Sequence, residues 1–247
     1  MLAHIAVVPS APLLVPELAG PQAFDTAPVR AAATAAVRRL ATHAGRWVAV
    51  GVADRPLGGP ARVTCTDHGD FGAYGVPIRV QIPRAAGAEP PPLAMLLAGW
   101  LGAQAAQAPS SITPCIVDPD LAPDVARQVG RDLGFGDTDP VNLLVVADGA
   151  TALSPGAPGG GERESAWALQ RRIDAALAAA DPAGLAGLTV AECVAEGVGT
   201  RVAWQVLAGV LESLAACGIP VTSEISYAAA PFGVGYTVGN LTPQGAR

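Results

Sequence analysis

The sequence predicts an α/β fold with a central, mostly parallel sheet and helices on both of its faces. Short apolar strand patterns alternate with helix patterns along the chain, which is typical of parallel strands joined by helices. The run at 141–147 is almost entirely apolar, as expected for a strand covered on both faces. Hydrophobic residues make up 51% of the 247 residues, which is enough to fill a substantial core.

The first strand is expected at His4–Val8, and it leads into a loop with prolines at positions 9, 12 and 16. Proline fixes the backbone angle φ, so this loop should present Ser10 in a defined direction. In open α/β sheets, ligands bind at the carboxyl ends of the strands. A helix should follow over 29–40, where apolar residues recur at helical spacing, with Asp25 and Thr26 as candidate N-caps.

The remaining elements follow from the same patterns. Strands are expected at 47–52, 76–82, 112–117, 141–147, 221–228 and 235–241, helices at 92–106, from 118 onward, at 164–180 and at 202–216, and a glycine- and proline-rich loop at 148–161. No internal repeat and no long polar linker interrupts this order. We therefore predict a single domain over residues 1–247.

Charge and hydropathy exclude several classes of protein. The net charge is −6, and no Lys/Arg cluster could neutralise several phosphates, so nucleic-acid binding is disfavoured. The longest apolar stretch, Leu93–Ala103, is too short to span a bilayer, and no secretory leader pattern is present. The alanine-rich chain is expected to be cytoplasmic, with its four scattered cysteines reduced and packed as small apolar groups.

Two groups of residues suggest chemistry by their type alone. Asp67, His68 and Asp70 lie within four residues and are weak metal-ligand candidates, but a solvated polar loop explains them better. Ser10 is a candidate nucleophile for a metal-independent hydrolase. It lacks the G-x-S-x-G elbow and needs a base supplied by folding.

Five motifs together resemble a known family. They are Val8-Pro-Ser-Ala-Pro-Leu-Leu-Val-Pro-Glu-Leu, Phe71-Gly-Ala-Tyr-Gly-Val, Val145-Val-Ala-Asp-Gly with Ala157-Pro-Gly, Trp204-Gln-Val-Leu-Ala-Gly, and Ala230-Pro-Phe-Gly-Val-Gly-Tyr. In this order they resemble motifs of the class III extradiol ring-cleavage dioxygenase family, the superfamily that includes the protocatechuate 4,5-dioxygenase β-subunit. The resemblance spans residues 3–240 and implies that family's fold.

The resemblance also implies where a metal site would lie. Catalytic members hold Fe(II) with two histidines and a glutamate and use a further histidine as acid/base. On this chain the metal histidines fall at Ser10 and near Ala53 or Asp54, and the acid/base histidine falls near Leu153. The glutamate falls at Thr200, with Glu196 one turn earlier as a conceivable substitute. None of the expected ligands is present, so the resemblance implies a degenerate metal site.

The sequence therefore favours a divergent, non-catalytic member that binds a small molecule or a protein partner in the former active-site cleft. The cleft candidates are Ser10, Pro12, Asp54, Asp148, Leu153 and Thr200. No cofactor is expected in this interpretation, and self-association into a homo-oligomer is compatible with it. The alternatives are a ring-cleaving dioxygenase that holds Fe(II) with rearranged ligands, such as His68, Asp67 or Glu196, and a hydrolase that uses Ser10.

Overall fold

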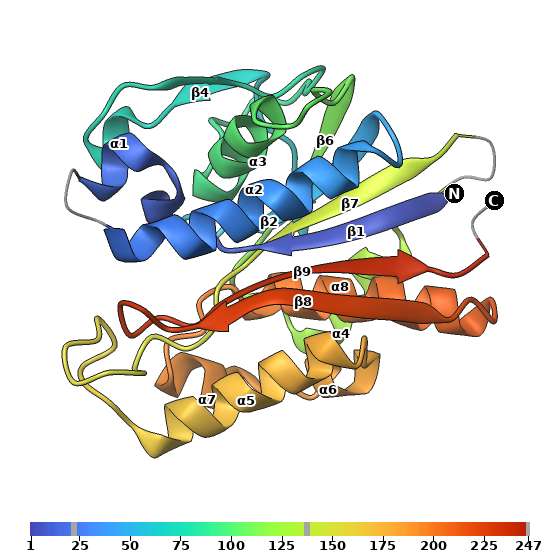
Figure 1. The fold of residues 1–247 in the computed structure, drawn as a ribbon. Helices are drawn as coiled ribbons and strands as arrows, with labels where there is room; N and C mark the ends of the chain where they lie inside the picture. The colour runs from blue at the N-terminus through green and yellow to red at the C-terminus, as the bar shows by residue number, and fades with distance from the viewer. Residues whose placement is uncertain (21–23, 136–138, 246–247) are drawn as a thin grey trace.

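A computed structural model describes residues 1–20, 24–135 and 139–245. In this part of the chain the main feature is a seven-stranded mixed sheet with the strand order β3-β6-β2-β7-β1-β9-β8. Helices cover both faces of the sheet (Figure 1). The α/β class predicted from the sequence is therefore confirmed.

The centre of the sheet consists of four parallel strands. They are β6 (Ser111–Val117), β2 (Arg46–Val52), β7 (Val141–Val146) and β1 (Leu2–Val8). The other three strands run antiparallel to their neighbours: β9 (Tyr236–Pro243), β8 (Val221–Ala229) and the short β3 (Arg62–Val63). The sheet is thus parallel at its centre and antiparallel at both sides.

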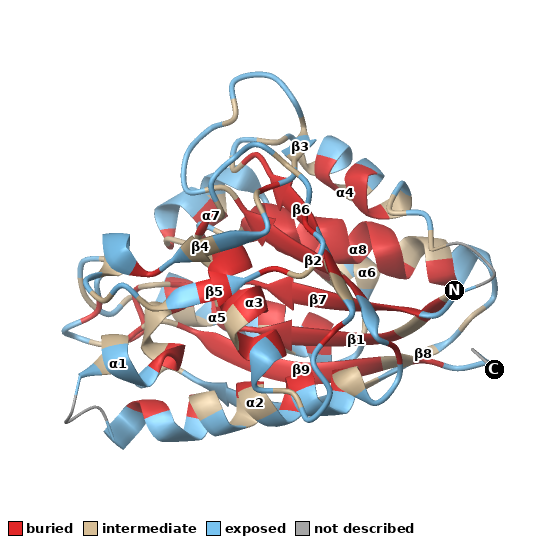
Figure 2. Ribbon diagram, turned by 90° about the horizontal axis from the view of Figure 1, so that it is seen from above, coloured by how far each residue is buried: buried red, intermediate tan, exposed pale blue. Residues whose placement is uncertain are grey.

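Side chains alternate between the two faces of the central strands, so each face has its own core. On one face, α2 (Ala27–Ala41) and α3 (Leu93–Ala103) pack on Ala6, Val8, Leu144 and Val146. On the other face, α4 (Pro123–Arg131), α5 (Glu164–Ala178) and α8 (Arg201–Ala216) pack on Ile5, Val7, Leu143 and Val145. Figure 2 shows the central strands buried between these layers. Coverage on both faces is why the β7 sequence is apolar without alternation.

Two helices on the second face touch through their backbones. A Cβ on Gly209 of α8 would lie 2.0 Å from the carbonyl oxygen of Arg127 in α4. A Cβ on Gly130 of α4 would lie 2.0 Å from the carbonyl oxygen of Val206. Only glycine permits so close an approach, and it allows α8 to be buried along most of its length.

The short elements complete the chain. They are η1 (Pro12–Leu14), α1 (Pro16–Ala19), η2 (Phe24–Thr26), β4 (His68–Asp70), η3 (Gly72–Tyr74), β5 (Arg79–Gln81), α6 (Pro182–Ala186) and α7 (Val190–Ala195). The strands β4 and β5 form a separate antiparallel pair.

Three sequence predictions need correction. The helix expected from Asp118 begins only at Pro123, because the Asp118 carboxylate accepts hydrogen bonds from the backbone of Leu57 and Asp120 and holds a loop there. The strand expected at 76–82 is shortened to β5. The segment interpreted as a solvated polar loop contains the short strand β4, although Asp67, His68 and Asp70 are exposed as expected.

A stacked histidine pair lies near the amino ends of the parallel strands. The rings of His4 in β1 and His43, which follows α2, stack with their centroids 4.1 Å apart. His4 is fully buried; its Nδ1 lies 3.2 Å from the Thr242 hydroxyl, and its Nε2 has no hydrogen-bond partner in the described structure. Burial, His43 and Arg39 together lower the pKa of His4 to about 4. Burial and Arg39 also lower the pKa of His43.

Candidate functional site

A polar side chain follows each of the four parallel strands at the carboxyl edge of the sheet. Ser10 and Asp54 follow β1 and β2, and Asp118 and Asp148 follow β6 and β7. The sequence predicted Ser10, Asp54 and Asp148 at this edge but not Asp118. The structure divides these residues into different local environments.

Ser10, Asp148 and Thr200 form one connected cluster. The backbone N–H of Ser10 donates a hydrogen bond of 2.8 Å to Oδ1 of Asp148. The Thr200 hydroxyl accepts from the Asp148 N–H at 2.8 Å and donates to the Asp148 carbonyl at 2.7 Å. The Trp204 indole N–H donates to the same carbonyl at 3.0 Å. The start of α8 is thereby joined to the end of β7, and three of the predicted cleft residues lie together.

The Asp148 carboxyl group lies in an environment that favours its neutral form. Burial raises its pKa to about 7, and the hydrogen bond from Ser10 opposes this only in part. Burial and the nearby Asp148 charge also raise the pKa of Tyr236, the first residue of β9. A carboxyl group that titrates near neutrality can both donate and accept a proton, which is a common property of functional sites.

Asp54 lies in a separate pocket at the end of β2. This open pocket has a volume of about 520 Å³, and its wall includes Asp54, Tyr74, His68, Pro91 and Leu96. The backbone N–H of Leu93 lies 3.4 Å from the Asp54 carboxylate, and the Tyr74 hydroxyl is close enough to hydrogen bond with it. Desolvation still raises the pKa of Asp54, and it raises that of Tyr74 to about 12. The pocket therefore presents hydrogen-bond acceptors beside an apolar wall.

The other cleft candidates have structural partners. Pro12 begins η1 and is only partly buried. Leu153 is buried in the core of the second face, and its N–H donates to the carbonyl of Gly233. Asp67 and His68 are both exposed and bond to each other at 2.7 Å. Glu196 is buried and forms an ion pair of 2.9 Å with Arg163.

The residues at the expected metal position do not fit Fe(II). Such sites need two imidazoles and a carboxylate that leave coordination positions open. Here the Thr200 hydroxyl is bonded to the Asp148 backbone, and one Asp148 oxygen is bonded to Ser10. His68 faces Asp67, and Glu196 is held by Arg163. Among the described residues, no three His, Cys, Asp or Glu side chains come together as a metal site would require.

Sequence reasoning missed the tyrosines. Tyr74 and Tyr236 fall inside motifs that resembled the family, yet neither was assigned to a site. Their proximity to Asp54 and Asp148 depends on the β4–β5 hairpin and on the antiparallel β9, and neither arrangement follows from local pattern. Asp118 could have been found, because it directly follows an apolar strand, as Asp148 does.

In comparisons with known proteins, no family model matches the chain, and no curated protein sequence matches it significantly. The resemblance to the extradiol family therefore stays a prediction. Within residues 1–20, 24–135 and 139–245, none of the helices has the length and hydropathy that a transmembrane span requires.

Proposed function

We propose that this chain binds a small organic molecule in the pocket beside Asp54, with no ring-opening chemistry. The observation that carries the proposal is the pocket of about 520 Å³ at the carboxyl end of β2, where α/β sheets bind ligands. We also propose that the fold is that of the class III extradiol dioxygenases. The order of the five motifs supports it, and so does the placement of Ser10, Asp148 and Thr200 around one point.

The walls of the pocket indicate the chemistry of the ligand. Asp54 and Asp70 supply carboxylates, while Pro90, Pro91 and Leu96 supply apolar surface. Desolvation disfavours the charged form of Asp54, so a cation placed beside it would recover favourable electrostatic energy. A primary amine attached to a compact apolar group satisfies both walls.

The alternative enzymes have less support. A dioxygenase with rearranged ligands would have to hold iron with His68, Asp67 or Glu196, but Asp67 and His68 bond to each other and Glu196 pairs with Arg163. A hydrolase would need a base for the Ser10 hydroxyl, but the hydrogen bond between Ser10 and Oδ1 of Asp148 comes from the Ser10 backbone N–H instead. Binding without reaction needs only the carboxylates and the apolar side chains that line the Asp54 pocket.

The test compares two ligands of similar shape and opposite charge, 2-phenylethylamine and phenylacetate. We expect the amine to bind in calorimetry and to raise the melting temperature, and phenylacetate to do neither. Asp54→Asn should weaken amine binding by about tenfold or more, because a hydrogen bond to a charged group is worth about 1.5–3 kcal/mol. Asp25→Asn is the matched control, since Asp25 is an exposed carboxylate outside the pocket wall.

Two results would overturn the proposal. Equal binding of both compounds, or binding that Asp54→Asn leaves unchanged, would remove the assigned site. Stoichiometric iron in protein purified anaerobically with Fe(II), together with oxygen uptake on adding a catechol, would establish the dioxygenase.

A further inference from the structure

A second pocket lies on the other face of the sheet, between the loop after β6, the helix α7 and the start of α8. Its volume is about 320 Å³, and its wall includes Asp120, Val190, Val194, Val198 and Arg201. The Asp54 pocket shares none of these residues. This second pocket combines a buried cation, an acidic residue and an apolar wall.

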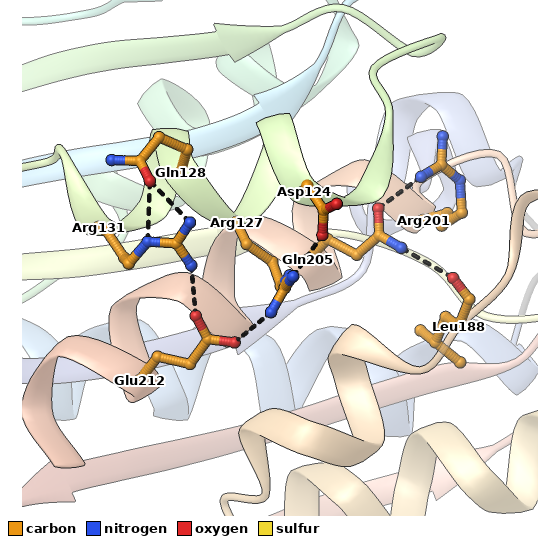
Figure 3. A network of polar contacts seen from close by, with 8 residues as sticks. All are labelled: Asp124, Arg127, Gln128, Arg131, Leu188, Arg201, Gln205 and Glu212. Carbon is orange, nitrogen blue, oxygen red and sulfur yellow. Dashed lines mark hydrogen bonds and ion pairs between the residues drawn. The ribbon is translucent and has the colours of Figure 1, made fainter. Parts of the chain in front are cut away.

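Arg201 is the buried cation of the pocket. Only 5% of this residue is exposed, yet no carboxylate of the described residues lies within ion-pair distance of it. Its guanidinium donates to Oε1 of Gln205 at 2.5 Å and to the Leu121 carbonyl at 2.9 Å, with a longer contact of 3.4 Å to the Pro119 carbonyl. Figure 3 shows Gln205 extended between Arg201 and the Leu188 carbonyl.

This arrangement leaves part of the guanidinium uncompensated. A guanidinium carries five N–H donors, and the contacts above use three of them, all on the two terminal nitrogens. Its acceptors are neutral amide and carbonyl oxygens, so the positive charge is not neutralised. The neighbouring arginines differ, because Arg127 and Arg131 both pair with Glu212 (Figure 3). A buried charge without an opposite charge is costly unless a partner binds.

Asp120 supplies the opposite charge on the same wall. Its carboxylate is too far from Arg201 for a direct ion pair but close enough to oppose the effect of burial, which lowers the pKa of Arg201. The Asp120 side chain also has no ion pair with any other residue in the described part of the chain. Both charges therefore line one pocket without pairing directly, and a bound molecule could contact both.

The rest of the wall is apolar. Val190 and Val194 are 44% and 76% exposed, which is unusual for large aliphatic side chains on a helix as short as α7. Cys193 is buried and lines the same pocket, and burial raises the pKa of its thiol to about 11, so it stays neutral. This side of the pocket suits a branched aliphatic group.

We propose that this pocket binds a free α-amino acid with a branched aliphatic side chain. Its carboxylate would receive the remaining Arg201 donors, its ammonium group would face Asp120, and its side chain would cover Val190 and Val194. The pocket volume is at the lower end of the range for small-molecule sites, which suits a ligand of this size. The site is independent of the Asp54 pocket and of the function proposed there.

A purely structural role for Arg201 makes a different prediction. Arg201 tethers residues 119 and 121 of the loop, and if that were its whole role, charge on an added ligand would not matter. The test therefore uses three probes in calorimetry: L-leucine, 4-methylpentanoate, which lacks the ammonium group, and 3-methylbutylamine, which lacks the carboxylate. We expect L-leucine to bind and each analogue to bind at least tenfold more weakly.

Substitutions of Asp120 and Arg201 show which charged group of the ligand each residue binds. Asp120→Asn should weaken L-leucine binding about tenfold and leave 4-methylpentanoate binding unchanged or stronger, while Asp132→Asn, an exposed acid outside the pocket wall, should change neither. Arg201→Lys should weaken L-leucine and 4-methylpentanoate alike. If Arg201→Lys fails to fold, the Asp120→Asn variant and the three probes still test the proposal. Absence of L-leucine binding, equal binding of all three probes, or an Asp120→Asn variant that binds L-leucine like the wild type would each overturn the proposal.

Discussion

The stacked pair of His4 and His43 makes stability depend on pH in a direction that the structure specifies. Above pH 6.5, His4 is neutral in both the folded and the unfolded chain and contributes no pH dependence. As the pH falls below 6.5, the unfolded chain binds a proton at His4. The folded chain does not, because burial, His43 and Arg39 disfavour the charged ring. The free energy of unfolding must therefore fall as the pH decreases from 6.5 to about 4.

The size of the effect follows from the two pKa values. The difference between 6.5 and about 4 corresponds to a loss of about 3 kcal/mol. Such a loss is a large part of the stability of an ordinary domain, which is about 5–15 kcal/mol. Raised carboxyl pKa values, as at Asp148, act in the opposite direction, so the contribution of His4 must be isolated by mutation.

His4→Phe isolates the contribution of His4 to the pH dependence, because phenylalanine retains a ring that can stack on His43 but does not titrate. Urea unfolding of the wild type and the variant would be measured between pH 7.5 and 4.5. We expect the wild type to lose about 2–3 kcal/mol more than the variant over this range. His68→Gln removes an exposed imidazole outside the stacked pair and should follow the wild type.

Parallel pH dependence in the wild type and His4→Phe would refute the reasoning. An NMR titration gives an independent check, since the chain has only three histidines. A His4 ring that titrates at 6.5 in the folded protein would show that its environment does not disfavour the charged form.

Three further predictions concern the carboxyl edge and the packing of α8. Asp148→Asn should raise the melting temperature relative to the wild type at pH 8 but not at pH 4. In the wild type, the pKa of the Asp148 carboxyl group is raised to about 7, so the stability of the wild type relative to the variant falls as the pH rises toward that value. An equal difference in melting temperature at pH 8 and at pH 4 would contradict this. Thr200→Val should lower the free energy of unfolding, measured in urea, by about 1–3 kcal/mol, because the Asp148 N–H and carbonyl both lose a hydrogen-bond partner. An unchanged urea midpoint would show that water replaces the hydroxyl. Gly209→Ala should destabilise the fold by about 2 kcal/mol or more, because its new Cβ would meet the α4 backbone. Gly156→Ala is the matched control, because this glycine has nothing within 4 Å of an added Cβ and does not have a positive φ. Equal destabilisation of the two variants would argue against the close helix contact.

Much of the fold was predictable because local patterns decide it. The central strands and the long helices lie within a few residues of their expected positions, since apolar periodicity sets both their type and the face they bury. The antiparallel direction of β8 and β9 was not predictable in this way. Strand direction depends on how the chain returns to the sheet, and a strand of either direction carries the same alternation.

The candidate site was predictable only in part. Ser10 and Asp148 could be placed together because each lies two residues after the end of a parallel strand, and the carboxyl ends of such strands share one edge. Leu153 was assigned from its place after a motif, and such a count does not report burial; the structure buries this side chain in the core of the second face. Arg201 and Asp120 lie 81 positions apart in the numbering, and no local signal brings them to one pocket.

The backbone contact between α4 and α8 has a consequence for motion. With Gly130 and Gly209 in the contact, there is no layer of side chains through which these helices could slide, so they should move as one rigid body. Arg201 opens one of these helices, and Asp120 lies in the loop that leads into the other. The two charged residues of the second pocket therefore lie at or next to the ends of this pair of helices. The apolar side of the pocket, on α7, lies outside the glycine contact and is joined instead to α5 by the ion pair of Arg172 with Glu192.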